Sequence, residues 1–209
     1  MFLSADDIAE RVAAGLVLCD PFDPRLLKPA SYVLRLGPRF GVLGPGSEPI
    51  RIWSEKAGHD RLTFIEATET FVLEPNVFVL ATTLESVALP EDLVGFLSGL
   101  SHLARIGLSI HLDAAIVSPT FGRGCATRIT LELSSHNPAP LVLQVGMPIC
   151  HLALATTTRR SPTNLRLDLQ RSIYEGLPSP TGTLLYEEFN QIIGRKPDHG
   201  LTRQHGEPK

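Results

Sequence analysis

The chain of 209 residues is predicted to fold as a mainly β domain, a barrel or jelly roll with one short helix near its N-terminus. Two observations predict this class. From residue 32 onward, apolar residues come in short β-rich runs, and Gly, Pro and Asn separate one run from the next. Helical periodicity is confined to the first sixteen residues or so.

The helix is predicted by a capping pattern at its start. Ser4 can accept a backbone hydrogen bond from the third helical residue, Asp7 can reach back, and Leu3 can pack on Ile8. We expect this helix to end at about Gly15 and to serve the core rather than chemistry.

Eight strands are expected after a break at residues 20–24, where two prolines interrupt regular structure. They cover residues 32–36, 71–73, 77–83, 94–97, 109–112, 128–133, 141–144 and 149–155. Residues 38–70 are predicted to be an irregular excursion from the barrel. One domain is expected over residues 1–194, followed by a flexible tail over 195–209.

Composition excludes several classes of partner. A net charge of −3 does not suit binding to nucleic acid through bulk charge, and no run of about 20 apolar residues is present to cross a membrane. Cys19, Cys125 and Cys150 lie far apart, so they predict neither a zinc knuckle nor a disulfide framework. We expect a cytoplasmic protein that binds neither nucleic acid nor membrane.

The common catalytic motifs are absent from the sequence. It lacks a P-loop, a Rossmann glycine pattern, a GxSxG elbow and an HExxH pair. It also lacks the HxE and PCxxC pattern of zinc nucleobase deaminases, and its seven histidines show no ligand spacing. No metal-ligating residue is therefore predicted.

Two local patterns could carry chemistry. Ser101 and Arg105 are four residues apart, so one helical turn would place a hydroxyl and a guanidinium on one side, where both could grip phosphate oxygens. In the strand that follows, period two puts Arg128, Thr130 and Glu132 on one face. From the pattern alone, Glu132 either enters a polar cavity or lies on a solvated face.

Several short runs along the chain together form a recognisable pattern. In chain order they are Leu3-Ser4 with Asp7-Ile8, Asp20-Pro21-Phe22-Asp23, Leu34-Arg35-Leu36-Gly37, Phe71-Val72-Leu73-Glu74-Pro75, Thr83-Leu84-Glu85 with Leu89-Pro90, Gly99 to Leu108, Pro119-Thr120-Phe121-Gly122, Ile129-Thr130-Leu131-Glu132-Leu133, Gly146-Met147-Pro148-Ile149, and Tyr174-Glu175-Gly176 with Pro180-Thr181, Tyr186 and Phe189. Through these runs the chain resembles, over nearly its whole length, the dCTP deaminase family, a branch of the trimeric dUTPase-like fold.

The resemblance implies a distorted jelly roll of the dUTPase-like type with a C-terminal arm, assembled as a homotrimer with nucleotide sites between subunits. It implies hydrolytic deamination of dCTP to dUTP without zinc, with Mg²⁺ bound through the triphosphate. In this reading Glu132 is the catalytic residue that activates water. The nucleotide-binding residues are Ser101, Arg105, His111, Ala114 and Tyr174.

The chain departs from the family pattern around the phosphate-binding run. Leu100 stands where the family has a basic residue, His102 replaces a second serine, and Ser118 replaces an aspartate. Arg123 and Arg128 are candidates for compensating phosphate contacts. Two alternatives to dCTP deamination therefore stay open: a noncatalytic nucleotide-binding or regulatory member of the fold, and a member that acts on a different nucleotide.

Overall fold

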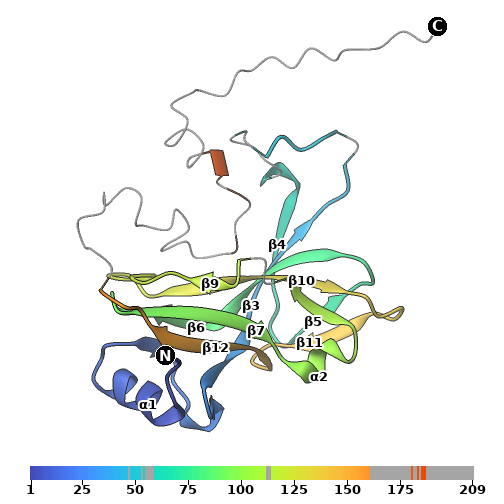
Figure 1. The fold of residues 1–209 in the computed structure, drawn as a ribbon. Helices are drawn as coiled ribbons and strands as arrows, with labels where there is room; N and C mark the ends of the chain where they lie inside the picture. The colour runs from blue at the N-terminus through green and yellow to red at the C-terminus, as the bar shows by residue number, and fades with distance from the viewer. Residues whose placement is uncertain are drawn as a thin grey trace, which may run out of the picture.

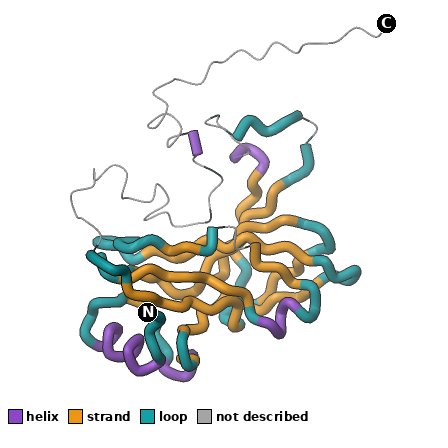
Figure 2. Tube along the Cα trace, viewed as in Figure 1, coloured by secondary structure: helices purple, strands orange, loops and turns teal. Residues whose placement is uncertain are grey.

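The computed structural model describes residues 1–46, 48–52, 54, 59–111, 114–160, 180, 183 and 185–186. Strands are the predominant secondary structure of this part of the chain, and its helices are short (Figure 1, Figure 2). The prediction of a mainly β fold with a short N-terminal helix is confirmed. No helix among the described residues combines the length and the apolar character needed to cross a membrane.

Helix α1 (Ala5–Ala13) begins with the predicted capping box. The Asp7 N–H donates to Ser4 Oγ at 3.2 Å, and the Ser4 N–H donates to Asp7 Oδ2 at 2.9 Å. Two backbone donors at the helix start are thereby satisfied, and Ile8 is buried below them. The helix ends at Ala13, two residues before the predicted end.

The remaining elements follow in chain order: β1 (Leu18–Asp20), η1 (Pro24–Leu26), β2 (Leu27–Lys28), β3 (Ser31–Leu43), η2 (His59–Arg61), β4 (Leu62–Glu66), β5 (Thr70–Leu73), β6 (Phe78–Ala88), β7 (Leu93–Gly99), α2 (Ser101–Ala104), β8 (Leu108–His111), β9 (Ile116–Val117), β10 (Thr127–Ser135), β11 (Leu141–Gln144) and β12 (Pro148–Thr156).

In the described part of the chain, one large sheet contains ten of the twelve strands. Its path runs β8-β10-β6-β3-β12-β7-β9, and β1, β2 and β4 pair with strands of that path. Strands β5 and β11 form a separate two-stranded sheet. Neighbouring strands along this path are antiparallel, as expected for a jelly roll.

The large sheet must curl, because its two edge strands are close in the sequence. Strand β8 ends at His111 and β9 begins at Ile116, so these two residues can lie at most about 18 Å apart. Strands β7 and β8 are also in contact, although they are remote along the sheet path. The sheet therefore closes most of the way to a barrel.

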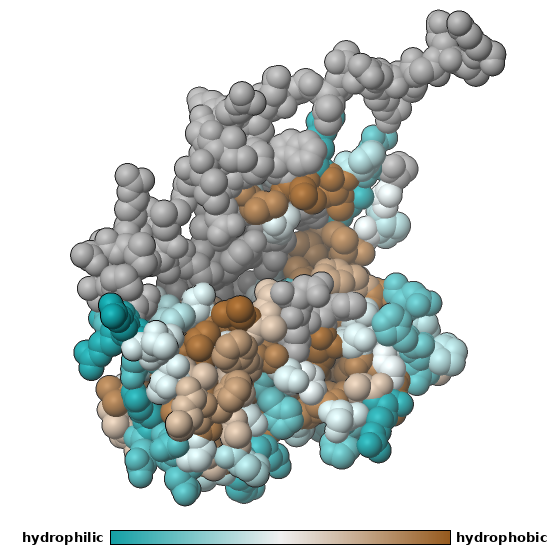
Figure 3. Space-filling view, in the orientation of Figure 1, coloured by the Kyte–Doolittle hydropathy of each residue, from teal (hydrophilic) through white to brown (hydrophobic). Residues whose placement is uncertain are grey.

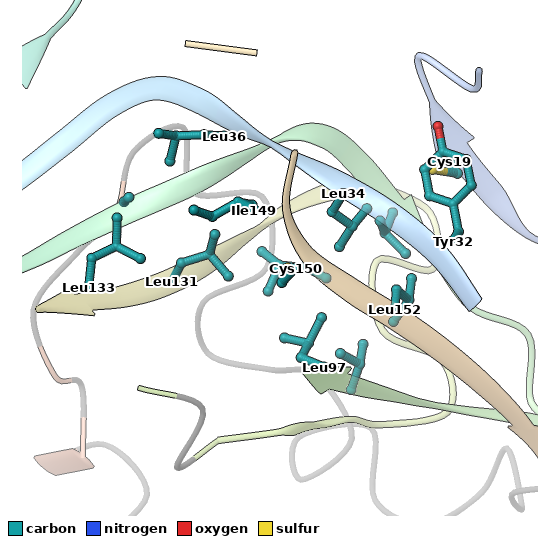
Figure 4. Close-up of a cluster of buried hydrophobic side chains, with 14 of the residues drawn as sticks. Cys19, Tyr32, Leu34, Leu36, Leu97, Leu131, Leu133, Ile149, Cys150 and Leu152 are labelled. Atoms are coloured by element: carbon teal, nitrogen blue, oxygen red, sulfur yellow. The ribbon is translucent and has the colours of Figure 1, made fainter. Parts of the chain in front are cut away.

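The curled sheet encloses an apolar core built from strands that are distant in sequence. Leu131 and Leu133 of β10 meet Leu36 of β3 and Ile149 of β12, with Leu97 of β7 nearby (Figure 4). All of these side chains are buried. Since the core occupies one face of β10, the opposite face of that strand is available for polar side chains.

Two sequence predictions about the strands need correction. Residues 38–70 are not wholly irregular, because β3 continues to Leu43 and pairs with β4. The pair Gly37-Pro38 marks a bulge within β3 rather than its end: Leu36 pairs with Thr83 and Phe40 with Ala81, so three residues of β3 face one of β6. The short strands β1, β2 and β9 were also missed.

Candidate active site

Glu132 lies on the face of β10 that does not enter the core. Its strand alternates between buried and half-buried residues throughout, and Glu132 is half-buried. The adjacent Leu131 and Leu133 are completely buried, with 0% exposure. The parity predicted from the sequence is confirmed, and it keeps the carboxylate of Glu132 out of the apolar core.

The backbone partner of Glu132 on one side is His111, the last residue of β8, and on the other side Leu80 of β6. Ala114 follows His111 by three residues and is exposed. The next carbonyl, that of Ala115, accepts a hydrogen bond from the Leu97 N–H at 2.9 Å. The structure thus brings Glu132 and His111 into register and holds the segment that carries Ala114 against β7.

Ser101 and Arg105 share one helical turn, as predicted. The Arg105 N–H donates to the Ser101 carbonyl at 3.2 Å, and both residues are exposed. This turn is tied to the end of β10, because the His136 N–H donates to the Gly107 carbonyl at 2.8 Å. A strand rises about 3.4 Å per residue, so His136 lies about 13 Å beyond Glu132 along the chain.

Within one chain, therefore, α2 and the pair Glu132–His111 lie at opposite ends of β8. The hydroxyl and guanidinium expected to hold phosphate are both exposed at one end, and the carboxylate expected to activate water is at the other.

The two arginines expected to compensate for lost phosphate contacts have different surroundings. Arg123, in the turn before β10, makes an ion pair with Glu91. Arg128 is on the same face of β10 as Glu132 but four residues away, about 13 Å along the strand. Tyr174, the remaining predicted nucleotide contact, lies outside the described residues.

A second carboxylate, Glu85 of β6, is sequestered from the candidate site. Its side chain has 0% exposure, and Arg35 of β3 donates to it from the backbone N–H at 2.8 Å and from Nε at 2.6 Å. A buried carboxylate with two such donors is a structural group rather than a base open to substrate. Its position in the alternating pattern of β6 is the sequence signal that could have revealed its burial.

Thiol chemistry is disfavoured at the two buried cysteines. Burial, with a smaller contribution from the negative charge of Glu85, raises the pKa of Cys19 and of Cys150 to about 12 each. Neither thiol is ionised near neutral pH, so neither is an effective nucleophile. Among the described residues, no group of three or more His, Cys, Asp or Glu side chains is arranged to hold a metal ion.

The curled, mainly β sheet with a half-buried glutamate on its outer face is a distorted jelly roll of the dUTPase-like type. A solved structure with this fold is that of 2'-deoxycytidine 5'-triphosphate deaminase from Agrobacterium tumefaciens, with a TM-score of 0.58 and 21% identity. The match covers 75% of this chain and 48% of that longer chain. At this identity the likeness concerns the fold alone.

The chain belongs to the dCTP deaminase-like family, whose model matches residues 2–157. Relatives named "dCTP deaminase, dUMP-forming" include one from Acidothermus cellulolyticus, 37% identical over 192 residues, which are 91% of this chain and 98% of the relative. Another, from Thermobifida fusca, is 35% identical over 199 residues, 95% of this chain and 100% of the relative. The family expected from the sequence is confirmed.

Proposed function

We propose that this enzyme of the dCTP deaminase type hydrolyses the 4-amino group of dCTP, with Glu132 as the general base. Glu132 takes a proton from a water molecule, and the resulting hydroxide attacks C4 of the cytosine ring. That proton then passes to the departing amino group, which leaves as ammonia, and the second proton of the water ends on N3 as the hydroxyl at C4 becomes a carbonyl. A positioned carboxylate in this role contributes about 10²–10⁴-fold to the rate.

The placement of Glu132 carries this proposal. It is a half-buried carboxylate on the outer face of β10, in register with His111 and close in the sheet to the segment of Ala114. Backbone groups of such a segment suit recognition of a base edge, because their donors and acceptors are fixed in direction. The names of the relatives give the substrate, dCTP.

For the product we propose dUMP. The family resemblance implied dUTP, but the relatives are named as dUMP-forming enzymes. Formation of dUMP adds a second hydrolysis, in which water cleaves the bond between the α- and β-phosphates and pyrophosphate leaves. The two products differ in stoichiometry: one ammonia and one pyrophosphate per dCTP for dUMP, against ammonia alone for dUTP.

We propose that phosphate binding requires a homotrimer in which Ser101 and Arg105 of one subunit complete the Glu132 site of another. The opposite placement of these groups along β8 supports this arrangement. Exposed apolar side chains also favour assembly, including Phe64 of β4 and Ile116 of β9. Figure 3 displays apolar surface gathered on the face turned to the viewer. We propose that dCTP binds as its Mg²⁺ complex, with the ion held by the triphosphate.

The proposed roles are separated by two variants. Glu132→Gln keeps the shape of the side chain but removes its basicity, so dCTP deamination should fall at least ~10²-fold while nucleotide binding changes little. Arg105→Ala removes a charged donor and should weaken dCTP binding by roughly 1.5–3 kcal/mol. Deamination by Glu132→Gln at the wild-type rate would show that another group activates water. Binding of dCTP without deamination by the wild type would favour the noncatalytic alternative.

A further inference from the structure

Strands β6 and β10 fall out of register close to Glu132. Arg128 pairs with Ser86, but Thr130 pairs with Thr82, so residues 83–85 of β6 lie opposite the single residue Ile129. A bulge of this kind interrupts the regular ladder of backbone hydrogen bonds. Ile129 is buried, so its N–H cannot turn to water and needs another acceptor.

Thr83 provides that acceptor with its side chain. The Ile129 N–H donates to Thr83 Oγ1 at 2.9 Å, and the Thr83 hydroxyl donates in turn to the Glu85 carbonyl at 2.7 Å. Thr83 is itself completely buried, with 0% exposure. One hydroxyl therefore satisfies a donor on β10 and an acceptor on β6, both next to the change of register.

The bulge is anchored on its other side by the buried ion pair. The Glu85 carboxylate receives the Arg35 N–H and the Arg35 Nε–H from β3, and Arg35 Nη2 also donates to the Pro21 carbonyl at 3.3 Å. A continuous set of hydrogen bonds thus runs from β3 through the β6 bulge to β10. Removing any buried member leaves a polar group without a partner.

This arrangement bears on catalysis because Ile129 precedes Glu132 by three residues on the same strand. A slip of β10 by one residue would reverse its faces and direct Glu132 toward the core. We propose that Thr83 is a positioning residue for Glu132. The Thr83 hydroxyl fixes the register of β10 and its distance from β6 at the bulge. The inference rests on the proposed function, in which Glu132 is the general base.

The test compares Thr83→Val, which keeps the shape but loses the hydroxyl, with Thr83→Ser, which keeps the hydroxyl. For the valine variant we expect kcat for dCTP to fall about 10- to 100-fold with KM changed less than about threefold, because displacement of a catalytic group by about 1 Å costs this much. Thr83→Ser should stay within about threefold of the wild type. If the valine variant does not fold, Thr83→Cys, with its weaker hydrogen-bonding thiol, replaces it.

A control variant separates positioning from loss of stability. Leu143→Ala removes a buried side chain from β11, in the small sheet away from the bulge. It should lower the melting temperature without lowering kcat when assayed well below that temperature. Equal kcat losses in Leu143→Ala and Thr83→Val variants matched for stability would overturn the proposal.

Hydrogen exchange distinguishes failure of this inference from failure of the proposed function. The amides of β10 around Ile129 should exchange faster in Thr83→Val than in the wild type or in Thr83→Ser. Faster exchange with unchanged kcat would overturn the positioning role. Unchanged exchange in Thr83→Val would also overturn the positioning role, and this result can be obtained even if the wild type does not deaminate dCTP. Failure of the wild type to deaminate dCTP would by itself contradict only the proposed function.

Discussion

Two variants that are each impaired on their own at dCTP concentrations well below KM should restore activity when they assemble together. Glu132→Gln lacks the base but keeps Arg105, and Arg105→Ala lacks the phosphate contact but keeps Glu132. Because α2 and Glu132 lie at opposite ends of β8, we expect each site to take these two residues from different subunits. Some sites in mixed trimers would then contain both native residues.

The size of this effect follows from random assembly. In an equal mixture, half of the subunits offer Glu132 and the other half offer Arg105, so about a quarter of the sites receive both. At dCTP well below KM, the unselected mixture should therefore recover about a quarter of the wild-type ammonia release, and trimers purified on both tags about a third, because one of their three sites receives both residues. Each variant alone should stay far lower, at least ~10²-fold below wild type for Glu132→Gln.

The assay uses differently tagged variants that are unfolded and refolded together, followed by purification on both tags and measurement of ammonia release from dCTP. A mixture of two tagged Glu132→Gln preparations is the control and should gain nothing. Activity in the mixed trimers no higher than the average of the two variants would refute the shared site and place both groups in one chain.

Three further predictions concern stability. Gly122→Ala should destabilise the fold by at least about 2 kcal/mol in urea unfolding, since Gly122 has φ +67° and an added Cβ would meet the Val87 carbonyl oxygen. The control is Gly124→Ala, which should cost only about 1 kcal/mol, because Gly124 has φ +89° but open space around it. Thr120 holds φ +72°, which strains a β-branched residue, so Thr120→Gly should raise the unfolding free energy by about 0.5–1 kcal/mol, and a loss would contradict this assignment. Burial, with the charge of Lys28, lowers the pKa of His151 below its usual 6.5, so protonation favours the unfolded chain. The contribution of neutral His151 to the free energy of unfolding is present above about pH 6.5 and is lost as the pH falls through the folded-state pKa. The melting temperature of His151→Asn should therefore fall less steeply in acid than that of the wild type.

Local patterns were sufficient to predict much of the fold and the face on which Glu132 lies. The period of two along β10 depends only on strand geometry, so the parity of Glu132 against Leu131 and Leu133 could be assigned before any contact was known. The capping box at Ser4 and Asp7 is similarly local, and both predictions are confirmed.

Features that depend on distant contacts could not be predicted in this way. Gly37-Pro38 has the composition of a strand end, but it forms a bulge because Gly37 packs against β6, where an added Cβ would lie 2.7 Å from the Thr83 carbonyl oxygen. The pairing of Arg35 with Glu85 joins residues separated by 50 positions. Register shifts and buried ion pairs of this kind are set by the packed sheet rather than by the local sequence.

We propose that this chain deaminates dCTP through Glu132 and releases dUMP. The most direct measurement is to incubate the purified wild type and Glu132→Gln with dCTP and Mg²⁺ and to follow ammonia and pyrophosphate separately. We predict equal amounts of ammonia and pyrophosphate from the wild type and at least ~10²-fold slower ammonia release from Glu132→Gln. Ammonia without pyrophosphate would contradict the proposed product, and absence of ammonia from the wild type would contradict the deaminase function itself.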